Sequence, residues 1–153
     1  MRRRLAAALI IAAAAVPASA LAANVINGTA RADHLVGTVG ADRVNGRGGN
    51  DTILGKGGND RLNGNRGDDL ISGDAGNDVI TGGPGDDVVL GGAGNDRING
   101  GPGTDVITGG LGKDVIRVRD GEVDRVTCGP GHDRVVADRT DSVAKDCEVV
   151  QRG

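Results

Sequence analysis

Residues 73–81 read Gly-Asp-Ala-Gly-Asn-Asp-Val-Ile-Thr, and residues 91–99 read Gly-Gly-Ala-Gly-Asn-Asp-Arg-Ile-Asn. The same nine-residue block occurs ten times without slippage between Gly28 and Arg117. Position 1 is always Gly, position 4 is Gly in nine blocks of ten, position 6 is always Asp, and position 8 is always aliphatic. A short fixed period over ninety residues indicates one small structural unit stacked on itself.

Each block predicts a turn followed by a short strand. Positions 1 to 6 are rich in Gly, which tolerates the positive φ values of tight turns. Positions 7 to 9 are often β-branched, as in residues 79–81, and indicate a strand with position 8 facing inward. Two blocks make one coil of 18 residues, and coils stack about 4.8 Å apart. We therefore expect an all-β parallel β-roll (β-solenoid) with two parallel sheets of short strands.

Stacking aligns the position-6 aspartates in two rows, one along each edge of the roll. The odd-block row is Asp33, Asp51, Asp69, Asp87 and Asp105, and the even-block row is Asp42, Asp60, Asp78, Asp96 and Asp114. Carboxylates at strand spacing repel one another unless a cation lies between them. Ca²⁺ suits such a gap because it takes six to eight oxygens, including backbone carbonyls, whereas Mg²⁺ demands a smaller octahedral site.

The blocks resemble the nonapeptide G-G-x-G-x-D-x-U-x of the RTX (repeats-in-toxin) proteins, in strict register over about ninety residues. The resemblance implies calcium ions held between Asp carboxylates and turn carbonyls of neighbouring coils. Such carbonyls include those of Gly46, Gly55, Gly64, Gly73, Gly82, Gly91, Gly100 and Gly109. Five aspartates per edge leave four gaps, so up to eight ions fit the strict repeats. The alternative is that these side chains only cap turns, although Asn or Ser would serve equally and never occurs at position 6.

The repeat weakens at both ends. The first block lacks its second Gly, so Asp33 is expected to bind calcium weakly or not at all. One residue is inserted after Arg117, and the pattern resumes at Asp124 and Asp133, where poorer sites are expected. We divide the exported chain into the calcium roll, residues 23–117 with its ten repeats at 28–117, and degenerate repeats with a C-terminal cap, residues 118–153.

Residues 1–22 have the pattern of a secretory signal peptide. Three arginines precede an unbroken apolar run over residues 5–16, and two small-residue cleavage motifs end at Ala20 and Ala22. A retained membrane anchor is the alternative, although the run is short for a span. We expect an extracellular or cell-surface protein without a membrane span. Cys128 and Cys147 then suggest one disulfide, with free thiols or a metal pair as alternatives.

The outward positions of the two predicted sheets differ. Odd blocks present an apolar strip, a candidate face for self-association or a surface partner, that comprises Val36, Leu54, Leu70, Val88, Leu90 and Val106. Small aliphatic residues also simply suit strands, which is the plainer explanation. Even blocks present ladders of Arg and Asn, which suit either an acidic polymer or solvent.

Composition and motifs argue against two classes of function, nucleic-acid binding and catalysis. The chain has no aromatic residue and a net charge of −3, so nothing favours nucleic-acid binding. Beyond residue 22, Ser occurs only at Ser72 and Ser142 and His only at His34 and His132, with no catalytic arrangement, so we expect no enzyme. We expect a secreted calcium-binding protein whose folding is coupled to extracellular calcium. The alternative is a cell-surface or matrix interaction protein that uses the apolar sheet, with calcium only structural.

Overall fold

The computed structural model describes residues 23–153, and the expected signal peptide, residues 1–22, lies outside the described residues. One parallel sheet has eight strands, in the order β1 (Val25–Asn27), β3 (Arg43–Gly48), β5 (Arg61–Arg66), β7 (Val79–Thr81), β9 (Arg97–Asn99), β11 (Val115–Arg117), β13 (Arg134–Ala137) and β15 (Val149–Arg152). The other has seven, in the order β14 (Ser142–Val143), β12 (Arg125–Thr127), β10 (Val106–Leu111), β8 (Val88–Ala93), β6 (Leu70–Ala75), β4 (Thr52–Leu54) and β2 (His34–Val36).

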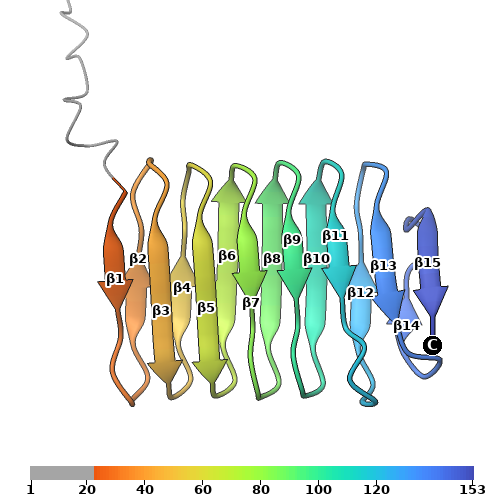
Figure 1. Cartoon of the computed structure of the whole chain (residues 1–153), viewed down its shortest axis with the longest axis horizontal. Helices are drawn as coiled ribbons and strands as arrows, with labels where there is room; N and C mark the ends of the chain where they lie inside the picture. Colours follow the sequence, from red (N-terminus) through yellow and green to blue (C-terminus); the bar gives the residue numbers. More distant parts are fainter. Residues whose placement is uncertain (1–22) are drawn as a thin grey trace, which may run out of the picture.

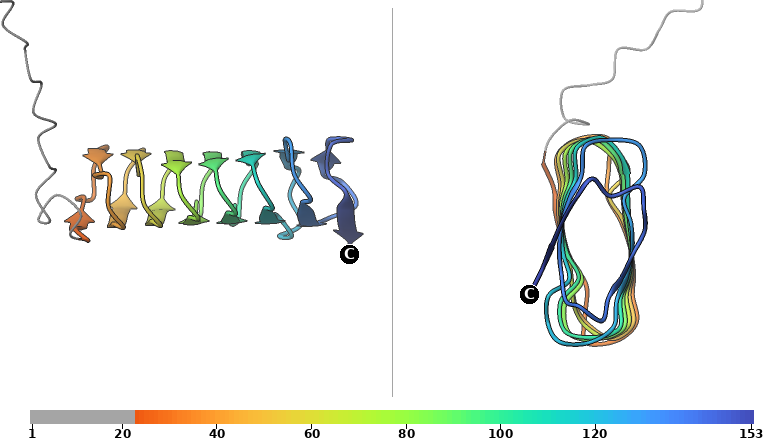
Figure 2. Two further views of the ribbon diagram at one scale, coloured as in Figure 1. Left: turned by 90° about the horizontal axis from the view of Figure 1, so that it is seen from above. Right: turned by 90° about the vertical axis from the view of Figure 1, so that its right-hand side faces the viewer.

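The chain winds into a straight tube whose successive strands alternate between the two sheets (Figure 1). Viewed along its axis, the tube is flattened, with the sheets on the long sides and the turns at the two narrow edges (Figure 2). Neighbouring strands of one sheet pair residues that lie 18 positions apart, such as Ile80 with Ile98. The offset becomes 19 at Ile116 and Val135, after the inserted residue. The predicted β-solenoid with two parallel sheets is confirmed.

The core is a single file of aliphatic side chains along the axis. Every position-8 residue from Leu35 to Val135 is buried, and the row comprises Leu35, Val44, Ile53, Leu62, Ile71, Ile80, Val89, Ile98, Ile107, Ile116, Val126 and Val135. Ile26 and Val143 pack against this row at the ends. Parallel strands are usually buried on both faces, but here the outer faces are open, so the inward row supplies most of the apolar burial.

The strands reach further into the repeat than expected. Positions 1 to 6 were expected to form the turn, yet β3, β5, β6, β8 and β10 continue through positions 1 to 3. The reason is that the inter-coil ladder continues through these positions, where Asp74 pairs with Gly92 and Ala75 pairs with Ala93. Left-handed backbone recurs at positions 2 and 4 of the block, as at Asp74 and Gly76, whose φ values are 69° and 139°.

The C-terminal segment continues both sheets. Strand β14 pairs with β12 and strand β15 pairs with β13, both in parallel. Cys128, which follows β12, forms a disulfide with Cys147, which precedes β15, and their Cα atoms are 5.2 Å apart. The predicted disulfide is confirmed, and it fastens the last coil to the coil before it.

Nowhere in residues 23–153 is there a helix with the length and apolar character that crossing a membrane requires.

Candidate metal centre

The position-6 aspartates form a hydrogen-bonded row along each edge of the tube. The Asp60 N–H donates to Oδ1 of Asp78 at 2.8 Å, and the Asp78 N–H donates to Oδ1 of Asp96 at 2.8 Å. On the opposite edge the Asp69 N–H donates to Oδ1 of Asp87 at 2.8 Å. Each carboxylate thus uses one oxygen to bind the backbone of the preceding coil, rather than to cap its own turn.

The second carboxylate oxygen has no protein partner in the middle and C-terminal coils. These buried Oδ2 atoms without a hydrogen bond belong to Asp51, Asp60, Asp69, Asp78, Asp87, Asp96, Asp105, Asp114, Asp124 and Asp133. A buried polar group without a partner costs about 1–3 kcal/mol, and a buried charge costs more. Ten such atoms in two regular rows are too many for a chain of this size to bear without a compensating partner.

The two N-terminal aspartates are different because threonines satisfy them. Oδ2 of Asp33 accepts hydrogen bonds from the Thr29 N–H at 2.6 Å and the Thr29 hydroxyl at 2.9 Å. Oδ2 of Asp42 accepts the same pair from Thr38, at 2.6 and 2.9 Å. The Asn24 N–H also donates to Oδ1 of Asp42 at 2.9 Å. The Oδ2 atoms of both carboxylates are therefore satisfied by protein groups alone.

Most orphaned oxygens border the same space as a backbone carbonyl of the next coil. The carbonyl belongs to a glycine beside Asp51, Asp60, Asp69, Asp78, Asp87 and Asp96, and to Cys128 beside Asp114. A Cβ built on Gly55 would lie 2.5 Å from Oδ2 of Asp60 and 2.8 Å from the Gly73 carbonyl oxygen, so both oxygens border the space that Gly55 leaves open. The glycine carbonyls beside orphaned oxygens are those of Gly64, Gly73, Gly82, Gly91, Gly100 and Gly109. Those of Gly46 and Gly55 take the equivalent place beside Asp33 and Asp42, whose Oδ2 atoms already have donors. A hard cation finds carboxylate and carbonyl oxygens together in such a cradle.

Burial makes these carboxylates hard to ionise in the absence of a cation. Burial raises the pKa of Asp78, Asp87 and Asp124 to about 7, and neighbouring carboxylates add to the shift. Burial likewise raises the pKa of Asp105 and Asp114 to about 6. The same cause raises the pKa of Asp60, Asp69 and Asp96.

Asp42 shows the opposite net shift. Burial raises its pKa, but the hydrogen bonds from Thr38 and Asn24 outweigh burial and leave the pKa below its ordinary value. The contrast follows the hydrogen-bond pattern, because Oδ2 of Asp42 has donors and the Oδ2 atoms farther along the row have none.

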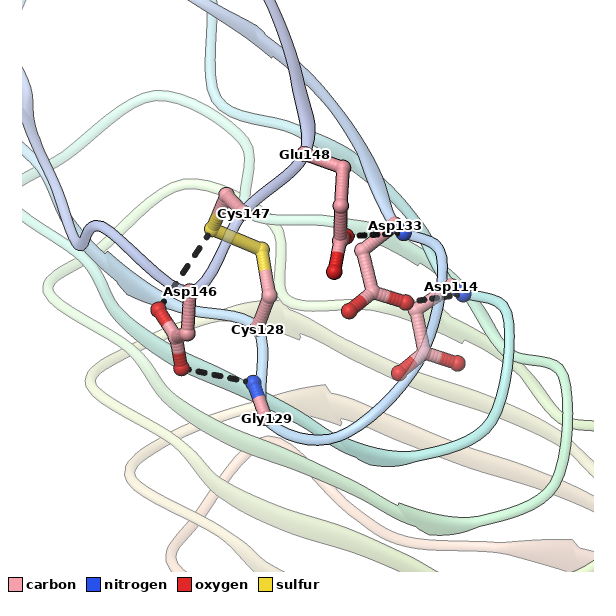
Figure 3. Close-up of a disulfide and its surroundings, with 7 residues drawn as sticks. All are labelled: Asp114, Cys128, Gly129, Asp133, Asp146, Cys147 and Glu148. Carbon is pink, nitrogen blue, oxygen red and sulfur yellow. Dashed lines mark hydrogen bonds between the residues drawn. A yellow bond between two sulfur atoms is a disulfide. The ribbon is translucent and has the colours of Figure 1, made fainter.

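Both rows continue past the strict repeats at the C-terminal end. The Asp114 N–H donates to Oδ1 of Asp133 at 2.8 Å, and the Asp133 N–H donates to Oε2 of Glu148 at 2.7 Å (Figure 3). On the other edge the Asp124 N–H donates to Oδ1 of Asp141 at 3.1 Å. The sequence reasoning missed Asp141 and Glu148 because they follow their row neighbours by 17 and 15 residues rather than 18.

No three His, Cys, Asp or Glu side chains within residues 23–153 gather into a group that could hold a metal by themselves. A cation in these rows would take one or two carboxylates and complete its shell with backbone carbonyls, which are oxygens that Ca²⁺ accepts. The donor set therefore fits calcium and does not fit a site built from side chains alone.

The edges also differ in their exposed residues at position 5. On the odd edge the Asp86 N–H donates to Oδ1 of Asp68 at 3.1 Å. On the even edge the Asn77 N–H donates to Oδ1 of Asn59 at 2.8 Å. The odd edge therefore carries additional negative charge beside its buried row.

The predicted apolar strip lies on the outer face of the seven-stranded sheet. Leu70, Val88, Leu90 and Val106 are exposed by about two fifths, at 42%, 39%, 40% and 43%. Val36 and Leu54, at the N-terminal end of the strip, are half-buried.

The disulfide at the C-terminal end is flanked by the Gly129 N–H, which donates to Oδ2 of Asp146 at 2.8 Å (Figure 3).

A family model described as the RTX calcium-binding nonapeptide repeat (4 copies) matches residues 22–53, 54–89 and 81–116. No curated protein and no solved structure matches the chain.

Proposed function

The chain belongs to the RTX calcium-binding nonapeptide repeat family, and on this premise we propose that it is a secreted protein that binds calcium ions between its stacked turns. The proposed carboxylate ligands are Asp51, Asp60, Asp69, Asp78, Asp87, Asp96, Asp105 and Asp114, with weaker contributions from Asp33, Asp42, Asp124 and Asp133. The proposed carbonyl ligands are those of Gly46, Gly55, Gly64, Gly73, Gly82, Gly91, Gly100 and Gly109. Up to about eight ions fit the strict repeats.

The orphaned Oδ2 atoms carry this proposal. Each of the ten is buried, unpartnered and beside another carboxylate of its row, so an ionised row is stable only with positive charge between its members. Calcium supplies that charge and accepts the mixed carboxylate and carbonyl oxygens. The chain's own glycines leave the space, since any side chain at position 1 would overlap the carboxylate.

We further propose that calcium binding and folding are one event. The chain contains 29 Gly and no aromatic residue, so ordering it is costly and its apolar core is thin. A ligand that binds only the folded state stabilises it by mass action. Extracellular calcium modules bind with Kd of about 10⁻⁴ to 10⁻³ M, which favours a loose chain in low-calcium cytoplasm and a folded chain outside.

Export and the division of the chain complete the proposal. Residues 1–22 serve as the signal peptide, residues 23–117 as the calcium roll, and residues 118–153 as degenerate repeats with the C-terminal cap. RTX repeat proteins are typically extracellular, and the Cys128–Cys147 disulfide fits an oxidising compartment. The family's repeat is a structural calcium-binding element rather than an enzyme class.

The variant Asp78→Asn is expected to bind fewer calcium ions than the wild type. In the gaps on either side of residue 78, its calcium affinity is expected to fall about tenfold, or about 1.4 kcal/mol. The amide keeps an oxygen for the Asp60 N–H but loses the charge that attracts the cation. Isothermal titration calorimetry of the calcium-free protein gives the number of ions and their affinity.

Asp42→Asn is the matched control, because Thr38 already satisfies Oδ2 of Asp42. It is expected to leave calcium binding within about twofold of the wild type. Equal losses in the two variants would contradict the link between orphaned oxygens and calcium, since only Asp78 has one.

We propose as a second function that the apolar strip on the seven-stranded sheet mediates self-association or contact with a surface partner. Leu70, Val88 and Val106 follow one another in one exposed row, and Leu90 lies in the row beside it, which favours this function. Replacing Leu54, Leu70 and Leu90 with Ser is expected to shift an oligomer to monomer and to abolish adsorption to cells. An unchanged mass by light scattering together with unchanged adsorption would show that the strip has no partner.

A further inference from the structure

Arginine is concentrated on the outer face of the eight-stranded sheet. Exposed arginines on its strands include Arg43, Arg61, Arg97, Arg117 and Arg134, and Arg47 is exposed near the end of β3. No strand of this sheet carries an Asp or Glu residue. The fold therefore separates charge, with carboxylates along the narrow edges of the tube and guanidinium groups across one broad side.

These guanidinium groups lack acidic partners within the protein. Among residues 23–153 the one ion pair joins Arg119 and Asp138, at 3.9 Å, and neither residue lies on this face. Arg134 donates to the neutral Gln151 side chain at 2.7 Å. Adjacent like charges at strand spacing, as at Arg43 and Arg61, disfavour the sheet unless an anion or solvent screens them. The face therefore offers unpaired positive charge to an external anion.

Two shallow hollows follow one another across the arginine face along the axis of the tube. The first, of about 260 Å³, lies between Arg43 and Arg61 and reaches Val79 and Thr81. The second, of about 250 Å³, shares Val79 and Thr81 and continues to Arg97 and beyond. They form a track that crosses successive strands, which suits an extended ligand better than a compact one.

The track combines three kinds of group. The arginines suit carboxylates, which the guanidinium fork binds through two parallel hydrogen bonds. A neighbouring row of Asn45, Asn63, Thr81 and Asn99 offers amides and a hydroxyl that bind sugar hydroxyl groups. Val79 and Val115 place small apolar patches between the arginines, against which the apolar face of a sugar ring packs.

The arginine spacing suits a repeating polymer. Three of the arginines, Arg61, Arg97 and Arg134, lie on β5, β9 and β13, which are every second strand of the sheet. Arg43 lies on β3 next to Arg61, and Arg117 lies on the intervening strand β11. Strands lie about 4.8 Å apart, so Arg61, Arg97 and Arg134 recur about every 9.6 Å along the axis. We propose that the outer face of the eight-stranded sheet binds a linear carboxylated polysaccharide that lies along the tube axis.

A polysaccharide is favoured over nucleic acid for two reasons. The chain has no aromatic residue on which bases stack, and the row of Asn45, Asn63, Thr81 and Asn99 beside the arginines suits the many hydroxyl groups of a sugar chain. The surface is separate from the aspartate rows, so it goes beyond the proposed calcium function and rests on it only for the folding of the tube.

The test measures binding of hyaluronate oligosaccharides, which carry a carboxylate on every second sugar, to the full-length mature protein in calcium. The variant Arg43→Thr/Arg61→Thr/Arg97→Thr removes three charges from the face, and Thr already occupies the equivalent position of β4 at Thr52. The control variant Arg31→Thr/Arg125→Thr/Arg139→Thr removes three exposed charges elsewhere.

The wild type is expected to bind, with an affinity that falls as salt rises. The face variant should weaken binding by about tenfold or more, and the control variant by less than about twofold. Circular dichroism in calcium establishes that each protein is folded. If the triple face variant does not fold, the single variant Arg97→Thr replaces it, and this variant is expected to weaken binding about threefold. No binding by the folded wild type, equal losses in both triple variants, or tighter binding of duplex DNA at the same face would overturn the proposal.

Discussion

In the presence of a chelator, the chain is expected to lose its β structure as the pH rises from about 4 to about 8. Without a cation the aspartate rows are stable only when their carboxyl groups are protonated. The pKa values of Asp78, Asp87 and Asp124 are raised to about 7 in the folded protein, against an ordinary value of 3.8. Those of Asp105 and Asp114 are raised to about 6.

The direction follows from proton linkage. Between the ordinary pKa and the raised pKa, the folded state holds more protons than the unfolded state, so stability falls as the pH rises. The contribution is fully present below pH 3.8 and is lost as the pH passes through about 6 and then about 7. Each such group contributes on the order of a few kcal/mol, and the groups within one row are coupled rather than additive.

Calcium is expected to reverse this dependence. Protons and calcium compete for the same carboxylates, so the calcium needed for folding rises as the pH falls. Far-UV circular dichroism over the pH range, with chelator and with excess calcium, measures both trends. A chelated chain that is folded at neutral pH and unfolds only in acid would contradict the assignment, because its carboxylates would then be satisfied without a cation.

Gly76→Ala is expected to destabilise the calcium-loaded protein by about 4 kcal/mol or more. Gly76 has a φ of 139°, which L-residues with a Cβ rarely adopt. A Cβ at Gly76 would also overlap the carbonyl oxygen of Gly58 in the preceding coil. Because the coils are held one strand spacing apart by their ladder hydrogen bonds, the backbone has no room to move away.

Gly48→Ala is the control, since both sites lie in or beside a turn. A Cβ at Gly48 would lie 3.6 Å from the Arg66 carbonyl oxygen, and its φ is not in the left-handed region. We expect a change within about 0.5 kcal/mol. Chemical denaturation in excess calcium gives both free energies of unfolding. Similar values for the two variants would show that the coils separate more easily than the structure indicates.

The period of nine was enough to predict the solenoid and its core. An aliphatic residue at every position 8, such as Ile71 and Ile107, forces one inward row, and pairing at a separation of 18 follows from two blocks per coil. The boundary between strand and turn was harder to predict from the sequence. Whether positions 1 to 3 extend a strand depends on inter-coil hydrogen bonds, which glycine permits but does not require.

The aspartate rows illustrate what a sequence period leaves open. It placed Asp78 and Asp96 in one row, but it could not say that Oδ1 would bind the neighbouring backbone and leave Oδ2 without a partner. The place of Asn24 at the start of the even row could have been predicted, because Asn24 lies nine residues before Asp33 and is in phase with the repeat. Glu148 follows Asp133 by 15 residues rather than 18, so it is out of phase with the repeat. Only the pairing of β13 with β15 in the structure places Glu148 in the row.

The role of the threonines at position 2 could not be predicted from the repeat pattern either. Thr29 and Thr38 occupy a variable position of the block, yet they donate to the aspartates that begin the two rows. This gives the N-terminal coils a neutral substitute for a cation. The weak calcium site expected at Asp33 stays a prediction, and the hydrogen bonds from Thr38 give the same physical reason to expect a weak site at Asp42.

The central claim is that calcium between the aspartate rows holds the coil together. Its most direct test is far-UV circular dichroism of the mature chain at neutral pH, titrated with calcium after chelation. We predict a cooperative transition from coil to β structure at about millimolar calcium that magnesium does not reproduce. A folded spectrum in chelator that calcium leaves unchanged would contradict the account, since it would mean that the buried carboxylates need no cation.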